Sequence, residues 1–176
     1  MEADILLFIQ EHLRVFWLDP IMKGVSLLGN TGIIWILTGI ALLFFKKTRR
    51  AGFDVLLCLL TAFILNNLII KNLVARVRPY EAIAGLEAIV PQLHDWSFPS
   101  GHACSSFAAA TSLALSFGKK GAWSFILATL IAISRVYVGV HYPSDVIVGI
   151  AVGSLTAYLT FKLSQKYIPF FERKIT

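Results

Sequence analysis

Three short groups of polar residues could carry chemistry in this otherwise strongly apolar chain. The first is Lys71 with Arg78-Pro79, the second is Pro99-Ser100-Gly101-His102, and the third is residues 134–145, which include Arg135, His141 and Asp145. Ionisable side chains at membrane depth or at its edge are costly, so they are usually retained for a function. These three groups are therefore the candidates for a functional site.

The cations of these groups predict an anion site. Lys71, Arg78 and Arg135 need a compensating anion in apolar surroundings, and planar guanidinium groups bind phosphate oxygens in a bidentate way. Ser100 is a favourable N-cap for a helix, whose free N–H groups and positive dipole end also attract anions. Gly101 would let the helix backbone approach the ligand closely. The pattern thus predicts that phosphate binds between these residues.

Two histidines and an aspartate could act on a bound phosphate. A carboxylate beside an imidazole fixes its tautomer and supports positive charge on it. His141 could therefore attack a phosphorus atom while Asp145 stabilises the imidazolium, and His102 could donate a proton to the departing oxygen. This set predicts hydrolysis of a phosphate ester through a covalent intermediate. A zinc site is not expected, because the nearby cations would repel the ion, and no cofactor is predicted.

The composition predicts an integral membrane protein. Of the 176 residues, 57% are hydrophobic and only 15% are charged, which is too little polar surface for a soluble domain of this size. A net charge of +6 would suggest nucleic acid in a soluble protein, but the basic residues here form short clusters between apolar runs. We therefore expect a single membrane domain over residues 1–176, without a nucleic-acid partner. The sequence predicts no particular oligomeric state.

The apolar runs predict an all-α integral membrane protein, a bundle of five to six transmembrane helices with an N-terminal amphipathic interfacial helix. A helix needs about 20 apolar residues to cross a bilayer. The expected spans are residues 21–45, 51–74, 100–117, 122–138 and 145–163. Small and polar residues in the first span, such as Asn30, are interpreted as sites of close helix packing.

Residues 1–19 predict the amphipathic helix, which would lie in the membrane interface with Trp17 as an anchor. The alternative is a short sixth span, which would place the polar residues among 10–14 in lipid. Between the second and third spans, residues 76–98 form a polar loop of a length that often carries function. Arg76 lies outside the pattern of the other cations and is interpreted as facing lipid headgroups.

The basic residues place the three groups on the outer side of the membrane. The turns after the first and third spans are basic, as is the C-terminal end. These positions are Lys46, Lys47, Arg49, Arg50, Lys119, Lys120, Lys166, Arg173 and Lys174. The N-terminal helix on the other side carries a net negative charge. By the positive-inside rule the basic side is cytoplasmic, so the three groups lie together at the outer end of the bundle.

The three groups resemble the three-part signature of the type 2 phosphatidic acid phosphatase (PAP2) superfamily. The parts here are Lys71, six residues and Arg78-Pro79; then Pro99-Ser100-Gly101-His102; then Ser134-Arg135, five residues, His141, three residues and Asp145. The superfamily also includes soluble vanadium haloperoxidases, but the spanning helices expected here argue against that branch.

The resemblance implies a metal-independent membrane phosphatase that acts through a phosphohistidine. His141 would be the nucleophile, Asp145 its partner and His102 the general acid. The phosphate ligands that it implies are Lys71, Arg78, Ser100, Gly101 and Arg135.

The resemblance also implies a lipid substrate at the outer face of the cytoplasmic membrane. Undecaprenyl diphosphate is the first expectation; phosphatidylglycerol phosphate, phosphatidic acid and lipid A phosphates are the alternatives. Several undecaprenyl diphosphatases of the family are expected to carry an acidic residue where Gly101 stands, so this position departs from their pattern. The loop at 80–98 is expected to select the substrate. A lipid-phosphate binder or translocator is the alternative from another class, although binding alone would require only the cations.

Overall fold

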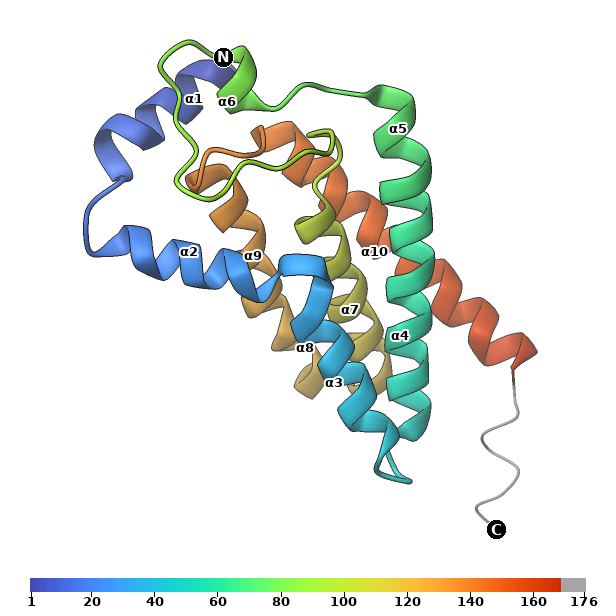
Figure 1. Ribbon diagram of the computed structural model, residues 1–176. Helices are drawn as coiled ribbons and strands as arrows, with labels where there is room; N and C mark the ends of the chain where they lie inside the picture. Colours follow the sequence, from blue (N-terminus) through green and yellow to red (C-terminus); the bar gives the residue numbers. More distant parts are fainter. Residues whose placement is uncertain (169–176) are drawn as a thin grey trace.

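The computed structural model describes residues 1–168, and this part of the chain consists of helices and loops without a β-strand (Figure 1). The elements in order are α1 (Glu2–Phe8), η1 (Ile9–Leu13), α2 (Leu18–Leu28), η2 (Asn30–Gly32), α3 (Ile33–Leu43), α4 (Arg49–Phe63), η3 (Ile64–Ile70), α5 (Lys71–Val74), α6 (Pro79–Ala82), α7 (Gly101–Phe117), α8 (Lys119–Ala122), α9 (Ser124–Tyr137) and α10 (Pro143–Tyr167). The all-α architecture is confirmed. The expected basic residues Arg173 and Lys174 lie outside the described residues.

Helix α7 lies inside the bundle and packs against α4, α9 and α10. Small side chains make this possible, because a stretch of alanines around residues 108–110 is fully buried. A Cβ atom at Gly149 in α10 would lie 2.6 Å from the carbonyl oxygen of Ser100, just before α7, and one at Gly153 would lie 2.2 Å from that of Cys104 within α7. This close approach joins the starts of the two helices, where the backbone N–H of Ser100 donates to the carbonyl oxygen of Asp145 at 2.9 Å.

Two helical segments, Arg49–Ala82 and Pro143–Tyr167, have the length and apolar composition needed to cross a bilayer. Helices α2 and α3 become a third candidate if the bent pair is counted as one span. The helices at the third and fourth expected spans, α7 and α9, have 17 and 14 residues and are shorter than the roughly 20 that a straight crossing needs. The structure thus confirms long apolar helices at the second and fifth expected spans.

The segment expected as the first span is two helices rather than one. Helix α2 ends at Leu28, and α3 begins at Ile33 after a bend of 46°. Between them Thr31 and Gly32 have φ values of 52° and 68°, in the left-handed region that interrupts a right-handed helix. The small and polar residues of this stretch therefore do more than allow close packing, because they end α2.

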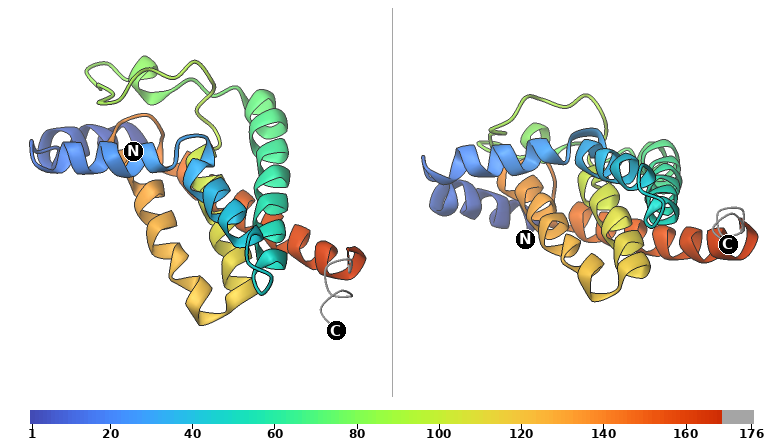
Figure 2. Two further views of the ribbon diagram at one scale, coloured as in Figure 1. Left: turned by 60° about the horizontal axis from the view of Figure 1, so that its bottom comes forward. Right: turned by 90° about the horizontal axis from the view of Figure 1, so that it is seen from below.

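The N-terminal helices fold back across one end of the bundle. Figure 2 shows α1 with η1 running beside α2, both across the direction of α9. Leu6 of α1 is buried against Tyr142. After η1, Arg14 donates to the carbonyl oxygens of Tyr137 at 3.0 Å and Glu87 at 2.6 Å. Helical elements α1 and η1 thus occupy residues 2–13 of the segment expected as an interfacial helix, and Arg14 joins their end to the loop that precedes α7.

A buried polar network joins α4 to α10 at the opposite end of the bundle. Asp54 is 1% exposed. Its carboxylate accepts hydrogen bonds from Ser164 Oγ at 2.6 Å, Gln165 Nε2 at 2.9 Å and Arg50 Nε at 3.0 Å. A buried carboxylate is tolerated only where it is paired and hydrogen-bonded. The network therefore fixes the packing of the two longest helical segments.

Replacing Asp54 by alanine is expected to lower the free energy of unfolding by about 3 kcal/mol, because it leaves a partly buried cation and two other donors without their acceptor. The measurement is a titration with a denaturing detergent. The control is Asp4→Ala, since Asp4 pairs with the N-terminal amine and is 81% exposed; little change is expected there. Equal stability of the two variants would contradict a stabilising role for the Asp54 network.

Candidate functional site

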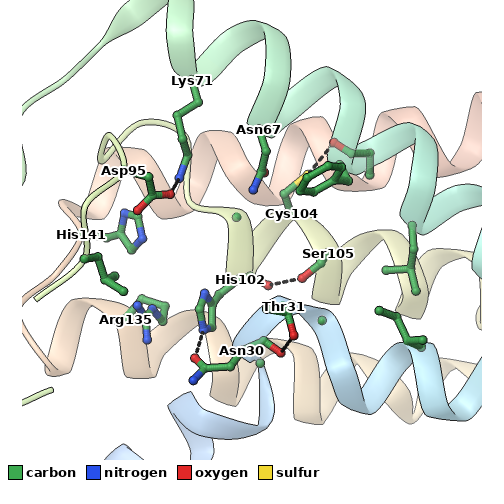
Figure 3. A pocket seen from close by; sticks show the side chains of 18 of the residues that line it. Asn30, Thr31, Asn67, Lys71, Asp95, His102, Cys104, Ser105, Arg135 and His141 are labelled. Carbon is green, nitrogen blue, oxygen red and sulfur yellow. Dashed lines mark hydrogen bonds and ion pairs between the residues drawn. The ribbon is translucent and has the colours of Figure 1, made fainter. Parts of the chain in front are cut away.

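The three groups predicted from the sequence meet at one end of the bundle (Figure 3). Lys71 begins α5, Arg78 precedes α6, His102 lies in the first turn of α7, Arg135 in the last turn of α9, and His141 in the turn before α10. All five line one cavity of about 750 Å³. Residues from five different segments of the chain thus contribute to a single site.

The three cations of the cavity are almost fully buried: Lys71 is 4% exposed, and Arg78 and Arg135 are each 2% exposed. Arg78 donates from Nη1 to the carbonyl oxygen of Val140 at 2.8 Å. Arg135 donates to the hydroxyl of Ser26, and its buried Nε has no hydrogen-bond partner within residues 1–168. An unpartnered guanidinium nitrogen beside two further cations is an arrangement that a bound anion would complete.

The carboxylate of Asp95 lies between two of these cations. Its oxygens accept hydrogen bonds from Lys71 Nζ and from Arg78 Nη2, each at 2.5 Å. Burial raises the pKa of Asp95, but the hydrogen bonds and positive charges of Lys71 and Arg78 outweigh it and hold the pKa at about 2. Asp95 is therefore ionised at neutral pH. The sequence placed it in the loop expected to select the substrate, not beside the cations.

His141 lies between Asp145 and the cations. Its Nδ1 is 3.5 Å from Asp145 Oδ2, at the outer limit of a hydrogen bond, and its Nε2 is 3.5 Å from Arg78 Nη1. Burial lowers the pKa of His141, and the positive charges of Arg135 and Arg78 lower it further. The hydrogen bond to Asp145 raises it, but not enough to compensate, and the resulting pKa is about 3. The imidazole is therefore neutral. A proton on Nδ1, facing Asp145, leaves the lone pair on Nε2.

Asp145 is buried behind His141 and does not line the cavity. Its Oδ2 accepts a hydrogen bond from Ser97 Oγ at 2.5 Å, and its Oδ1 accepts one from Arg76 Nη1 at 2.7 Å. Arg76 also pairs with Glu2 of α1 at 2.8 Å. The interpretation of Arg76 as facing lipid headgroups is therefore wrong, because it binds the carboxylate behind His141. Its position two residues before Arg78 could have indicated that Arg76 lies near the site.

His102 is held by the break between α2 and α3. Its Nε2 lies 2.9 Å from Oδ1 of Asn30, as Figure 3 shows. A Cβ atom at Gly29 would lie 2.7 Å from Cδ2 of His102, so the α2 backbone can come this close only at a glycine. Interpreting Asn30 as a packing residue missed this contact. Glycines on both sides of Asn30-Thr31 are a helix-breaking signal that could have indicated it.

Ser100 and Gly101 begin α7 as expected. The hydroxyl of Ser100 accepts a hydrogen bond from the backbone N–H of Ala103 at 3.4 Å, so it caps the helix. Ser100 is buried and, unlike Gly101, does not line the cavity. A Cβ atom at Gly101 would lie 3.3 Å from the side-chain amide of Asn67. The glycine therefore makes room for Asn67 at the cavity wall.

Neutral His141 predicts a pH dependence of stability. Folded His141 takes up a proton only near pH 3, whereas an unfolded histidine does so near pH 6.5, so the unfolded state binds more protons between these values. The stability that depends on neutral His141 is complete above pH 6.5 and is lost as the pH falls toward 3. We expect the wild type to lose thermal stability relative to His141→Gln between about pH 7 and pH 5. A constant difference over this range would contradict the burial of a neutral imidazole.

Comparisons with known proteins show which family this chain resembles. Residues 51–169 match the PAP2 superfamily. An undecaprenyl-diphosphatase of Sulfolobus acidocaldarius is 36% identical over 156 residues, which are 86% of this chain and 73% of that protein. The crystal structure of Aquifex aeolicus LpxE superposes with a TM-score of 0.77 at 29% identity, covering 90% of this chain and 93% of that one.

A second solved structure, described as a transmembrane PAP2 type phosphatidylglycerolphosphate phosphatase from Bacillus subtilis, superposes with a TM-score of 0.74. It is 30% identical, and the match covers 96% of this chain and 87% of that one. Together with the long apolar helices, this likeness identifies a membrane protein. The family match extends over most of the chain and includes all three groups of the site, and we conclude that the chain belongs to the PAP2 superfamily.

Proposed function

We propose that this chain hydrolyses a lipid phosphate or diphosphate, with undecaprenyl diphosphate as its substrate. One observation carries the proposal: His141, neutral and backed by Asp145, lies in the same cavity as three buried cations. A protein that only bound or translocated a lipid phosphate would need the cations alone. It would not need a buried imidazole that faces a buried carboxylate.

In the proposed reaction, Nε2 of His141 attacks the phosphorus atom of a phosphate held by Lys71, Arg78 and Arg135. A nitrogen–phosphorus bond forms as the bond to the leaving oxygen breaks, and protonated His102 gives its proton to that oxygen. Water then attacks the phosphohistidine and gives a proton to His102. The nitrogen–phosphorus bond breaks, and inorganic phosphate leaves.

The surrounding residues support the charge changes of this reaction. Asp145 would stabilise the imidazolium that exists while His141 carries the phosphoryl group. The backbone N–H groups of Gly101 and His102, in the first turn of α7, would add donors to the phosphate oxygens, whereas that of Ser100 already donates to the carbonyl oxygen of Asp145. Lys71, Arg78 and Arg135 would stabilise the negative charge of the transition state, which is the task that a metal ion performs in many phosphatases. The reaction is therefore proposed to need no metal.

The shape of the cavity supports a lipid substrate. Away from the cations it is lined by apolar side chains of α3 and α4, among them Ile36, Leu56 and Leu60. Leu60 and Phe63 are 54% and 51% exposed, on a helix that is apolar enough to face lipid. A lipid could therefore place its phosphate among the cations and its tail along α3 and α4. A water-soluble phosphate ester would gain nothing from this apolar part.

We propose that the chain crosses the cytoplasmic membrane five times, through the bent pair α2–α3, the run from Arg49, and then α7, α9 and α10. The basic turn before α4 and the turn around α8 lie at the end of the bundle away from α5 and α6 (Figure 1). By the positive-inside rule, this arrangement supports a site on the extracytoplasmic side. Helix α1 would lie at the outer interface.

Two observations support different substrates. The Sulfolobus relative is named for undecaprenyl diphosphate, which supports a diphosphate of a long isoprenoid as the first candidate. The Bacillus subtilis structure is named for phosphatidylglycerolphosphate, and Gly101 departs from the acidic residue expected in several undecaprenyl diphosphatases. Phosphatidylglycerol phosphate is therefore the second candidate. Phosphatidic acid and lipid A phosphates complete the set to be compared.

The test is phosphate release by the purified chain in detergent from these four lipids, with His141→Ala as the blank. We expect kcat/KM for undecaprenyl diphosphate to exceed the others by about tenfold, which is about 1.4 kcal/mol of transition-state binding. Activity should be the same in EDTA. A tenfold preference in kcat/KM for phosphatidylglycerol phosphate would identify that lipid as the substrate in place of undecaprenyl diphosphate. Binding of lipid without release of phosphate from any of the four would show a binding protein instead.

A further inference from the structure

The anion site already holds a side chain of the protein itself. The carboxylate of Asp95 contacts Lys71 Nζ and Arg78 Nη2 at 2.5 Å each. Figure 3 shows it beside Lys71 and His141, in the cavity. A carboxylate presents two oxygens to these donors much as two oxygens of a phosphate would. The site therefore carries its own anion, supplied by the loop before α7.

Phosphate and this carboxylate compete for the same donors. A phosphate dianion placed against Lys71 and Arg78 would be repelled by Asp95 if the carboxylate stayed where it is. The carboxylate also satisfies the cations only in part, because Arg135 keeps a buried Nε without a partner within residues 1–168. A phosphate that reached all three cations would gain contacts that Asp95 does not make. It can therefore displace the carboxylate.

Asp95 can leave the cations without disturbing the fold. Its side chain is 52% exposed, although both of its partners are buried. The loop backbone is held by hydrogen bonds that do not involve the carboxylate. Arg78 Nε donates to the backbone carbonyl oxygen of Asp95 at 2.8 Å, and the backbone N–H of Ser97 donates to the carbonyl oxygen of Arg76 at 2.8 Å. A rotation of the Asp95 side chain toward solvent would thus open the site while the loop backbone stays in place.

We propose that Asp95 is an internal counter-anion that occupies the phosphate site when the site is empty, yields it to the substrate, and takes it back when inorganic phosphate leaves. This proposal rests on the proposed phosphatase function. Three buried cations would otherwise hold the product tightly and slow each turnover. Competition by Asp95 weakens phosphate binding by a factor set by the fraction of molecules in which the site is open. Asp95 thereby sets the affinity for phosphate and the rate of product release.

The test is the dissociation constant of inorganic phosphate, measured by calorimetry on the full chain in detergent. Asp95→Asn keeps the size of the side chain and removes its charge, so we expect phosphate to bind about tenfold more tightly or better. With lipid substrate, kcat should fall and inhibition by phosphate should become stronger. The matched control is Glu11→Gln, which removes an exposed carboxylate of η1, outside the loop at 80–98, and should leave phosphate binding unchanged. Equal or weaker binding by Asp95→Asn would overturn the proposal.

A second measurement uses the unmodified chain and so does not depend on the folding of a variant. In an experimental structure with orthovanadate bound, the Asp95 carboxylate should have left Lys71 and Arg78. Both contacts intact beside bound vanadate would overturn the proposal. The two proposals can be told apart. Tighter phosphate binding by Asp95→Asn without lipid hydrolysis would support the role of Asp95 as a counter-anion but not the enzyme. Lipid hydrolysis with unchanged phosphate binding by Asp95→Asn would support the enzyme but not the counter-anion. No phosphate binding by either protein would overturn the counter-anion, and no phosphate binding together with no lipid hydrolysis would overturn both.

Discussion

Three cations are buried at one end of an apolar helix bundle, and removing such charges from water costs several kcal/mol each unless partners replace the water. Arg78 donates to backbone carbonyl oxygens, and Arg135 donates to the hydroxyl of Ser26. Lys71 and Arg78 both form ion pairs with the carboxylate of Asp95. One carboxylate against three cations leaves an excess of positive charge. Burial and this excess together keep His141 neutral. The field that is proposed to bind phosphate therefore also keeps the proposed nucleophile unprotonated.

Helix packing brings these charges together. Because α7 is rich in small residues and α10 has glycines facing it, the starts of the two helices lie within hydrogen-bonding distance. Asp145 at the start of α10 is then reached by Arg76, which Glu2 of α1 holds from the other side. The N-terminal helix, the loop before α7 and the turn before α10 thus form one connected set around His141. The break between α2 and α3 supplies the opposite wall, with Asn30 against His102.

The residues that could be predicted from the sequence are those whose presence in an apolar chain is costly, such as Arg135 and His141. Their types and spacing indicated an anion site, and the topology indicated that they converge. The contacts of Asp95, Arg76 and Asn30 could not be predicted in the same way. A charged residue in a loop is usually solvated, and small polar residues in a helix serve packing as often as they break it. Only the folded loop and the bend at η2 show which neighbours these side chains meet.

The most direct test of the account is to identify the residue that becomes phosphorylated during turnover. The purified chain would be mixed with undecaprenyl diphosphate labelled in its terminal phosphate, quenched within milliseconds in alkali, digested and mapped. A phosphoryl group is expected on His141, stable in alkali and released by acid, with no label in His141→Ala. Label on another residue, or hydrolysis by His141→Ala at the wild-type rate, would contradict it.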